Sequence, residues 1–289
     1  MFPVQGYTKS YPESTYIVEC HNAPACLQGS ATELTGICAA GYRGFMCGSC
    51  QDNFIHNSQL DCVECGSYDT TLIQAFLRIS WFVILIYGLS RLNVKITATG
   101  DRQYKSFLKQ IKMIINHCIV LAAISNIKYN WSELLGDILN AQGYIIMLGS
   151  KFIDFGCLVA GSGIEDPEFY YFFKRLLFTL LFPFAMIIFM AFVLSLISCK
   201  KGSMNAIRDQ MICIVVVTLW LFHPDVCHAV FASLSCVEDD LGRHRLFSDL
   251  EIVCWEGQHK SFVTWVTIPA VIVWVIGLPA FFLCMLRSN

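Results

Sequence analysis

Charged residues are scarce in this chain. Asp, Glu, Lys and Arg make up 15% of its 289 residues, whereas apolar residues make up 55%. An average soluble domain contains about 25% charged residues, so this composition is typical of an integral membrane protein. It argues against a soluble enzyme, a nucleic-acid-binding protein and a disordered scaffold.

Sequence motifs for catalysis are also missing. The chain has no nucleophile elbow, no phosphate-binding glycine loop and no pair of metal ligands at helical spacing. We therefore expect no enzymatic activity and no cofactor. Residues 1–19 lack the apolar core of a signal peptide, and the chain stops directly after an apolar segment, so we expect a piece of a longer protein.

Long apolar runs, in contrast, are plentiful. Crossing a bilayer takes about 20 apolar residues as a helix, and five stretches meet this requirement. They are 70–90, 106–127, 176–198, 210–236 and 261–286. The shorter amphipathic run 134–149 predicts a helix that lies in the membrane interface. The expected fold class is an all-α membrane protein, with five transmembrane helices in 67–289 and a small polar N-terminal module in 1–66.

Basic residues predict the orientation of these helices. With the N-terminus outside, the inner segments 91–112, 199–209 and 287–289 contain 10 Lys/Arg and 2 Asp/Glu, and the much longer outer segments contain 9 Lys/Arg and 19 Asp/Glu. Cytoplasmic loops are enriched in Lys and Arg, so we expect the N-terminus on the extracellular or lumenal side. The N-glycosylation sequon at Asn130 then falls in an outer loop.

Cysteine is abundant and is concentrated on the predicted outer side. Seven of the 15 cysteines lie in the first 65 residues, and the predicted topology places ten outside, an even number. These ten disulfide candidates are Cys20, Cys26, Cys38, Cys47, Cys50, Cys62, Cys65, Cys157, Cys236 and Cys254. Such a density in a small segment with few core residues is typical of an oxidising compartment. Cys236 and Cys254 bracket the last outer loop and are a candidate pair, which leaves Cys157 for a cysteine of the N-terminal module.

Zinc is the alternative interpretation of four of these cysteines. Cys47-x-x-Cys50 and Cys62-x-x-Cys65 have the spacing of tetrahedral zinc ligands. A cytosolic module would favour the metal, whereas the predicted outer location favours disulfides.

Two charges lie deep within the predicted spans, Arg78 in the first and Asp225 in the fourth, whereas Lys109 and Lys112 lie at one end of the second. Charges are costly in hydrocarbon, so we expect Arg78 and Asp225 to pair, either to fix helix register or as part of a gating or permeation path. Pro224 predicts a kink in the fourth span between His223 and Asp225. Together with His228, these residues are candidates for an ion or proton site, and an ordinary kinked helix is the alternative.

The pattern C-x-x-G-Y-x-G-x-x-C from Cys38 to Cys47 resembles the second half of an epidermal-growth-factor (EGF)-like module. The cysteines that follow make the segment more similar to the laminin type. This resemblance implies that Cys38 pairs with Cys47 and Cys50 with Cys62, leaving Cys65 for a later partner. Modules of this kind are spacers and protein-contact surfaces.

The order of parts resembles large multipass surface proteins of protists and algae, in which cysteine-rich repeats precede a helical region similar to transient-receptor-potential (TRP) channels. Here the module at about 20–65 leads directly into the first span, and the last span contains Pro269 and Pro279. The resemblance implies a relative of cation channels or receptors on a cell-surface or ciliary membrane. We expect assembly with copies of itself or with other membrane or extracellular proteins, and the apolar composition predicts contact with lipid and not with nucleic acid.

The sequence departs from that pattern in three respects. Only five spans are found where a six-helix channel is expected, and no pore loop and no voltage-sensor arginine ladder can be recognised. The alternative function is therefore a non-conducting structural, adhesion or accessory subunit of a larger membrane complex.

Overall fold

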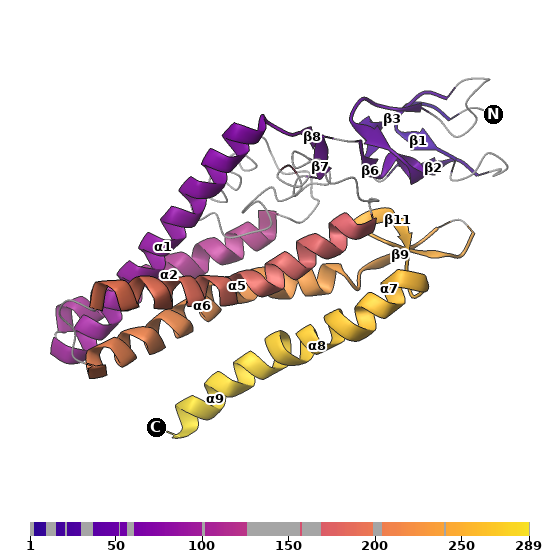
Figure 1. Cartoon of the computed structure of the whole chain (residues 1–289). Coiled ribbons are helices and arrows are strands. Elements are labelled where there is room, and N and C mark those ends of the chain that lie inside the picture. Colours follow the sequence, from indigo (N-terminus) through magenta and orange to yellow (C-terminus); the bar gives the residue numbers. More distant parts are fainter. Residues whose placement is uncertain are drawn as a thin grey trace. The chain divides into compact units, whose positions relative to one another are not determined.

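The computed structural model of the chain describes residues 3–9, 16–20, 22–29, 37–51, 53–56, 61–99, 102–125, 157, 169–198, 204–239 and 241–288 (Figure 1). The chain divides into two compact units. The first, here called the disulfide unit, comprises Met1–Thr71, Asp154–Leu176 and Cys227–Asn289. The second, the bundle unit, comprises Leu72–Ile153 and Leu177–Val226. The expected boundary between residues 66 and 67 stays a prediction.

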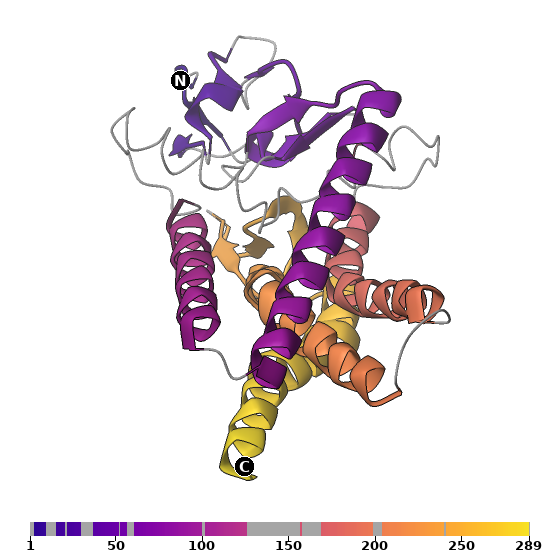
Figure 2. The ribbon, with the colours of Figure 1, turned by 90° about the vertical axis from the view of Figure 1, so that its left-hand side faces the viewer.

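Helices account for most of the described residues. The long ones are α1 (Tyr68–Thr99), α2 (Arg102–Ser125), α5 (Phe169–Ser198) and α6 (Met204–Ala232). The last helical run consists of α7 (Gly257–Phe262), η3 (Val263–Thr267), α8 (Ile268–Ala270), η4 (Val271–Gly277) and α9 (Leu278–Ser288). Figure 2 shows α1 as one unbroken helix.

Within the described residues, four helices are long and apolar enough to cross a membrane. They are Tyr68–Thr99, Phe172–Leu196, Ile207–Ala232 and Gly257–Ser288. They coincide with four of the five predicted spans and indicate a membrane protein. The other predicted span, 106–127, falls largely in α2, which is not among the four, so the count of five stays a prediction. The predicted interfacial helix at 134–149 lies outside the described residues.

An apolar core holds the bundle unit together. Its helices place apolar side chains at spacings of three and four residues, which puts them on one helix face. Fully or nearly fully buried members include Phe82 and Ile86 of α1, Met190 of α5, and Ile214 and Leu221 of α6. The core therefore joins segments that are far apart in the sequence.

The N-terminal module consists of short antiparallel strand pairs. They are β1 (Tyr7–Thr8) with β2 (Val18–Glu19), β3 (Cys26–Leu27) with β4 (Ile37–Cys38), β5 (Tyr42–Arg43) with β6 (Ser49–Cys50), and β7 (Phe54–His56) with β8 (Cys62–Glu64). Single-turn helices η1 (Ala23–Ala25) and η2 (Phe45–Cys47) separate some of them. Its buried cluster contains Cys20, Ala25, Cys26 and Cys47, so disulfides supply much of what little core it has.

A second β region corrects the all-α expectation for the membrane part. Between α6 and α7, the strands β9 (Cys236–Glu238), β10 (His244–Leu246) and β11 (Asp249–Val253) form an antiparallel sheet in the order β11-β10-β9. In β11 the buried Leu250 and Ile252 alternate with the exposed Glu251, which is the period of a half-buried strand. We call β9–β11 the outer sheet.

Candidate functional site

Five disulfides join the ten cysteines predicted to lie outside. They are Cys20–Cys26, Cys38–Cys47, Cys50–Cys62, Cys65–Cys157 and Cys236–Cys254. Cys38–Cys47 and Cys50–Cys62 are the pairs that the laminin-type resemblance implies. The four cysteines of the zinc alternative belong to three different disulfides. Cys118, Cys213, Cys227 and Cys284 are thiols.

Two disulfides each lie close to a histidine. Among the described residues, these two groups bring together three side chains of the types that bind metal ions. One is Cys50, His56 and Cys62, and the other is Cys236, Cys254 and His259, with ligand-type atoms within 4.8 Å of one another in each. Metal ions bind cysteine as the thiolate, which a disulfide sulfur is not. In this oxidised form neither cluster offers a metal a full set of ligands.

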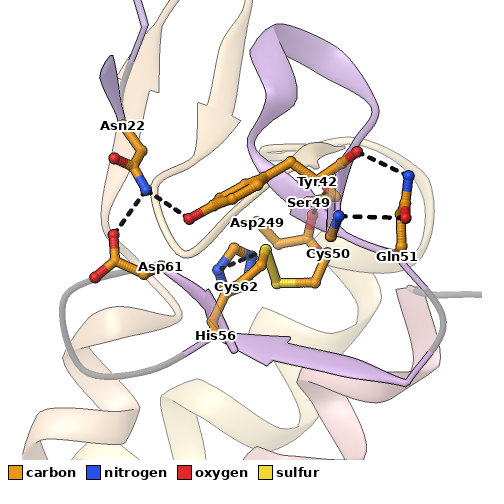
Figure 3. Close-up of a disulfide and its surroundings, with 10 residues drawn as sticks. Asn22, Tyr42, Ser49, Cys50, Gln51, His56, Asp61, Cys62 and Asp249 are labelled. Atoms are coloured by element: carbon orange, nitrogen blue, oxygen red, sulfur yellow. Dashed lines mark hydrogen bonds between the residues drawn. A yellow bond between two sulfur atoms is a disulfide. The ribbon is translucent and has the colours of Figure 1, made fainter. Parts of the chain in front are cut away.

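Polar contacts link the N-terminal module to the outer sheet across about 200 residues of sequence. The backbone N–H of Phe45 donates to a carboxylate oxygen of Glu251. The hydroxyl of Ser49 donates to Oδ1 of Asp249 at 3.2 Å, and Figure 3 shows the two side chains meeting. The first partner of each pair lies in the β5–β6 region and the second lies in β11. We call this set the head–sheet contact.

Two glycines let the outer sheet approach, Gly44 within the cysteine motif and Gly48 directly after it. Gly44 has φ +77°, and a Cβ there would also collide with Glu251. A Cβ on Gly48 would lie 2.6 Å from Leu250 Cδ1. A non-bonded contact between carbon atoms is normally about 3.5–4.0 Å, so a side chain at Gly48 displaces Leu250. The two glycines thus serve the head–sheet contact as well as the local turns.

Arg245 connects the outer sheet to the N-terminal module through its guanidinium. It lies over the ring of Phe45, with 3.8 Å from Cζ to the ring centroid. Its Nε donates to Asp239 at 3.2 Å and its Nη1 donates to the carbonyl of Leu250 at 2.8 Å. Arg245 is buried and so is the Asp239 side chain, so this is a charge pair largely withdrawn from water. Such a pair is costly to break by removing one partner.

Asp239 also shapes the turn between β9 and β10. Its Oδ1 accepts the backbone N–H groups of Leu241 and Arg243 at 3.0 and 2.9 Å. Aspartate commonly satisfies turn backbone in this way, and Gly242, with φ +74°, takes the left-handed position. The carboxylate that pairs with Arg245 is therefore held in place by the turn itself.

A buried hydrogen-bond chain joins the outer sheet to the ends of two helices. His259 of α7 is 1% exposed and accepts the backbone N–H of Trp255 at its Nδ1, 3.1 Å away. Its Nε2 consequently carries the proton and donates to the carbonyl of Ser233 at 3.1 Å. The Ser233 hydroxyl donates to Val230, so the hydroxyl of Thr267 donates to Ser233 at 3.1 Å.

Aromatic packing adds α5 to this assembly. Phe173 stacks on Phe262 of α7 with 3.9 Å between ring centroids. Both belong to a buried cluster that includes Leu246, Ile252 and Cys254 of the outer sheet region. The disulfide unit thus contains a continuous set of contacts from the N-terminal module through the outer sheet to α5, the end of α6 and the last helix.

The residues expected to form an intramembrane site all lie on α1 and α6. Arg78 is half-buried on α1, and His223, Pro224 and Asp225 are half-buried on α6. His228 is exposed, one turn further along α6. The helix continues through Pro224. The Arg78–Asp225 pair and the ion or proton site stay predictions, and Asn130 lies outside the described residues.

Other polar groups lie inside the bundle unit and were missed by sequence reasoning. The hydroxyls of Ser90 and Thr218 and both amide atoms of Gln210 have no hydrogen-bond partner, although these residues are 0%, 0% and 2% exposed. Ser90 is on α1, and the other two are on α6. Buried polar groups are usually hydrogen-bonded, often to water, so each of these side chains is a candidate partner for water or a polar ligand.

Sequence reasoning also missed Arg245 and His259. Both lie between the fourth and fifth predicted spans, 210–236 and 261–286, a segment for which only the disulfide Cys236–Cys254 is predicted. The alternation in Asp249–Val253 was the signal for a strand.

The comparisons with known proteins do not assign the chain to a family. No family model matches it, and neither does any curated protein or solved structure.

Proposed function

We propose that this protein is a multipass surface protein of channel-like or receptor-like function, in which the N-terminal module acts on the membrane helices through the outer sheet. The head–sheet contact carries the proposal. The outer sheet is the segment between α6 and α7, so any shift of the sheet is transmitted directly to two membrane-type helices. Disulfides favour an extracellular or lumenal location for the module.

The bundle unit favours conduction over a purely structural role. Ser90, Thr218 and Gln210 place neutral oxygen and amide groups in its interior. In a bilayer, polar groups of this kind face the bundle interior or a water-filled cavity and often mark a pathway. The proposal therefore includes a hydrated path used by a small cation, in a protein of the cell-surface or ciliary membrane.

Copy number and current test the proposal together. The complex is extracted gently from its native membrane, its mass and symmetry are determined, and the same material is reconstituted for current recording. A closed ring of identical subunits that conducts cations is the expected result. A single copy bound to unlike proteins, with no current, overturns it and makes the chain an accessory or anchoring subunit.

Two variants separate conduction from coupling. Gln210→Leu is expected to alter conductance because it removes polar groups from the bundle interior. Arg245→Met is expected to leave conductance unchanged and to alter gating, because it changes contacts of the outer sheet and of Phe45 and none inside the bundle unit. Equal effects of the two variants on conductance contradict the proposed division of roles.

A further inference from the structure

The five disulfides differ in how well solvent reaches them. Four of them contain at least one buried cysteine, namely Cys20 and Cys26, Cys47, Cys157, and Cys254. In Cys50–Cys62 both cysteines are half-exposed. Thiol–disulfide exchange requires access of a thiolate to a sulfur atom, and Cys50–Cys62 is the one of these five bonds in which neither cysteine is buried.

An imidazole lies beside the same bond. Nδ1 of His56 is 3.9 Å from Sγ of Cys62, and Figure 3 shows the ring facing the disulfide. His56 is on β7 and Cys62 opposes it on β8, so the hairpin register fixes this proximity. A nearby histidine stabilises a cysteine thiolate, and a better leaving thiolate departs faster in exchange.

The second histidine–disulfide cluster is a natural contrast. Both ring nitrogens of His259 are engaged, one with Trp255 and one with Ser233. His259 is buried, and the nearby Cys254 is 3% exposed. Both disulfides therefore lie near a histidine, but Cys236–Cys254 contains one buried cysteine, whereas Cys50–Cys62 contains none.

We propose that Cys50–Cys62 is a thiol-modification site, at which a low-molecular-weight thiol forms a mixed disulfide with Cys50. The incoming thiolate attacks Sγ of Cys50, a new S–S bond forms, and the Cys50–Cys62 bond breaks. The electron pair of the broken bond goes to Sγ of Cys62. Protonated His56 transfers its Nδ1 proton to that thiolate and becomes neutral, so atoms, charge and electrons balance.

The site lies at a point where modification has structural consequences. Cys50 is the residue after Ser49, which contacts Asp249 of the outer sheet, and Cys62 begins the strand that precedes α1. Opening the bond removes the covalent link between β6 and β8, while Cys65–Cys157 and Cys38–Cys47 remain closed.

Glutathione is the probe for the test. The full chain, in native membranes or detergent, is exposed to graded glutathione, reactive thiols are trapped with N-ethylmaleimide, and peptides are mapped by mass spectrometry. Cys50–Cys62 is expected to open about tenfold faster than Cys38–Cys47 or Cys236–Cys254. The glutathione adduct is expected on Cys50 and the maleimide adduct on Cys62.

Matched histidine variants test the role of the imidazole. His56→Asn is expected to slow opening of Cys50–Cys62 several-fold, and His244→Asn, which changes an exposed histidine of β10, is expected to leave the rate unchanged. The proposal is overturned if Cys236–Cys254 opens as fast, if glutathione is found on Cys62, or if His56→Asn has no effect. Should His56→Asn fail to form its disulfides, the order and the adduct position in the unaltered chain decide the question.

Discussion

The disulfide unit and the bundle unit are stabilised in different ways. In the disulfide unit the contacts are directional: five covalent bonds, a buried arginine and aspartate, and a histidine with both nitrogens engaged. In the bundle unit the core consists of apolar side chains such as Phe82 and Phe222, whose rings are 5.3 Å apart. Its buried polar groups include several with no hydrogen-bond partner.

This difference indicates a division of labour. Directional contacts fix the relative positions of the residues that they join. Under the proposed function, a displacement at one end of the disulfide unit would therefore move the residues at its other end. Packing between apolar helices in lipid depends on shape alone, because lipid is as apolar as the helices themselves. Such packing leaves room for rearrangement and for polar groups in the interior. Removing a buried polar group should therefore destabilise the disulfide unit, where that group has partners. In the bundle unit, removing a buried group without a partner should increase the stability.

The largest expected effect is loss of the disulfide at the outer sheet. Cys236→Ala combined with Cys254→Ala opens the loop that this disulfide closes, whose ends are 18 residues apart in sequence. The double substitution should destabilise the sheet by about 3 kcal/mol. Native-state proteolysis within the outer sheet should accelerate by about a hundredfold, because cleavage follows the open population. Cys284→Ala, at an exposed thiol, is the control and should leave cleavage unchanged.

A smaller loss is expected from the buried cation. Arg245→Met leaves Asp239 buried without that partner and removes the contact with Phe45, at a cost of about 2–3 kcal/mol. Arg243→Met removes a second arginine that pairs with Asp239, with 3.4 Å from its Nε to Oδ2, but its side chain is 45% exposed and the loss should cost under about 0.5 kcal/mol. Thermal unfolding in detergent, followed by near-ultraviolet circular dichroism, compares them. Similar losses of stability in both variants contradict the conclusion that the buried Arg245–Asp239 pair contributes more than the exposed Arg243.

Two glycines sharpen the comparison between the units. Gly48→Ala should destabilise the disulfide unit by about 1–2 kcal/mol, because the new Cβ forces Leu250 out of place. Gly88→Ala, in the helix interior of α1, meets nothing within 4 Å and should stabilise the bundle unit by up to about 1 kcal/mol. The two unfolding temperatures should move in opposite directions, and a shared direction is the contradictory result.

The smallest effect expected is a gain in the bundle. Gln210→Leu removes two buried amide atoms that have no partner and should stabilise the bundle unit by about 1 kcal/mol. Gln258→Leu, at an exposed position of α7, is the control and should stay within about 0.5 kcal/mol. Unfolding in a detergent series measures both. A clear loss in Gln210→Leu contradicts this prediction and means that the amide is structurally required.

The sequence predicts the helical part well because its signal is long. Four apolar runs of about 20 residues stand out against any background, and four membrane-type helices coincide with them. The predicted topology places ten cysteines on the outer side of the membrane, and the same ten form the five disulfides. Pairing between distant residues such as Cys65 and Cys157 depends on the fold and is not encoded in spacing.

The outer sheet is hard to predict because only Asp249–Val253 shows the alternation of a strand. Its strands are three to five residues long, and the register shifts between Arg245 and Leu246, which breaks the alternation that marks a strand. The bundle polar groups were missed because Ser90, Gln210 and Thr218 are neutral. A neutral residue inside an apolar run hardly changes its hydropathy or charge, so only burial and the lack of partners single these residues out.

Hydrogen exchange at Trp255 tests the central claim most directly. Its backbone N–H is bonded to His259 of α7 and lies just past the end of β11, outside the head–sheet contact, and Gly48→Leu disturbs that contact only from the side of the N-terminal module. If the disulfide unit transmits a displacement, amides of β11 and of Trp255 exchange faster in the variant than in the unaltered chain. Faster exchange confined to residues 37–50 contradicts the claim.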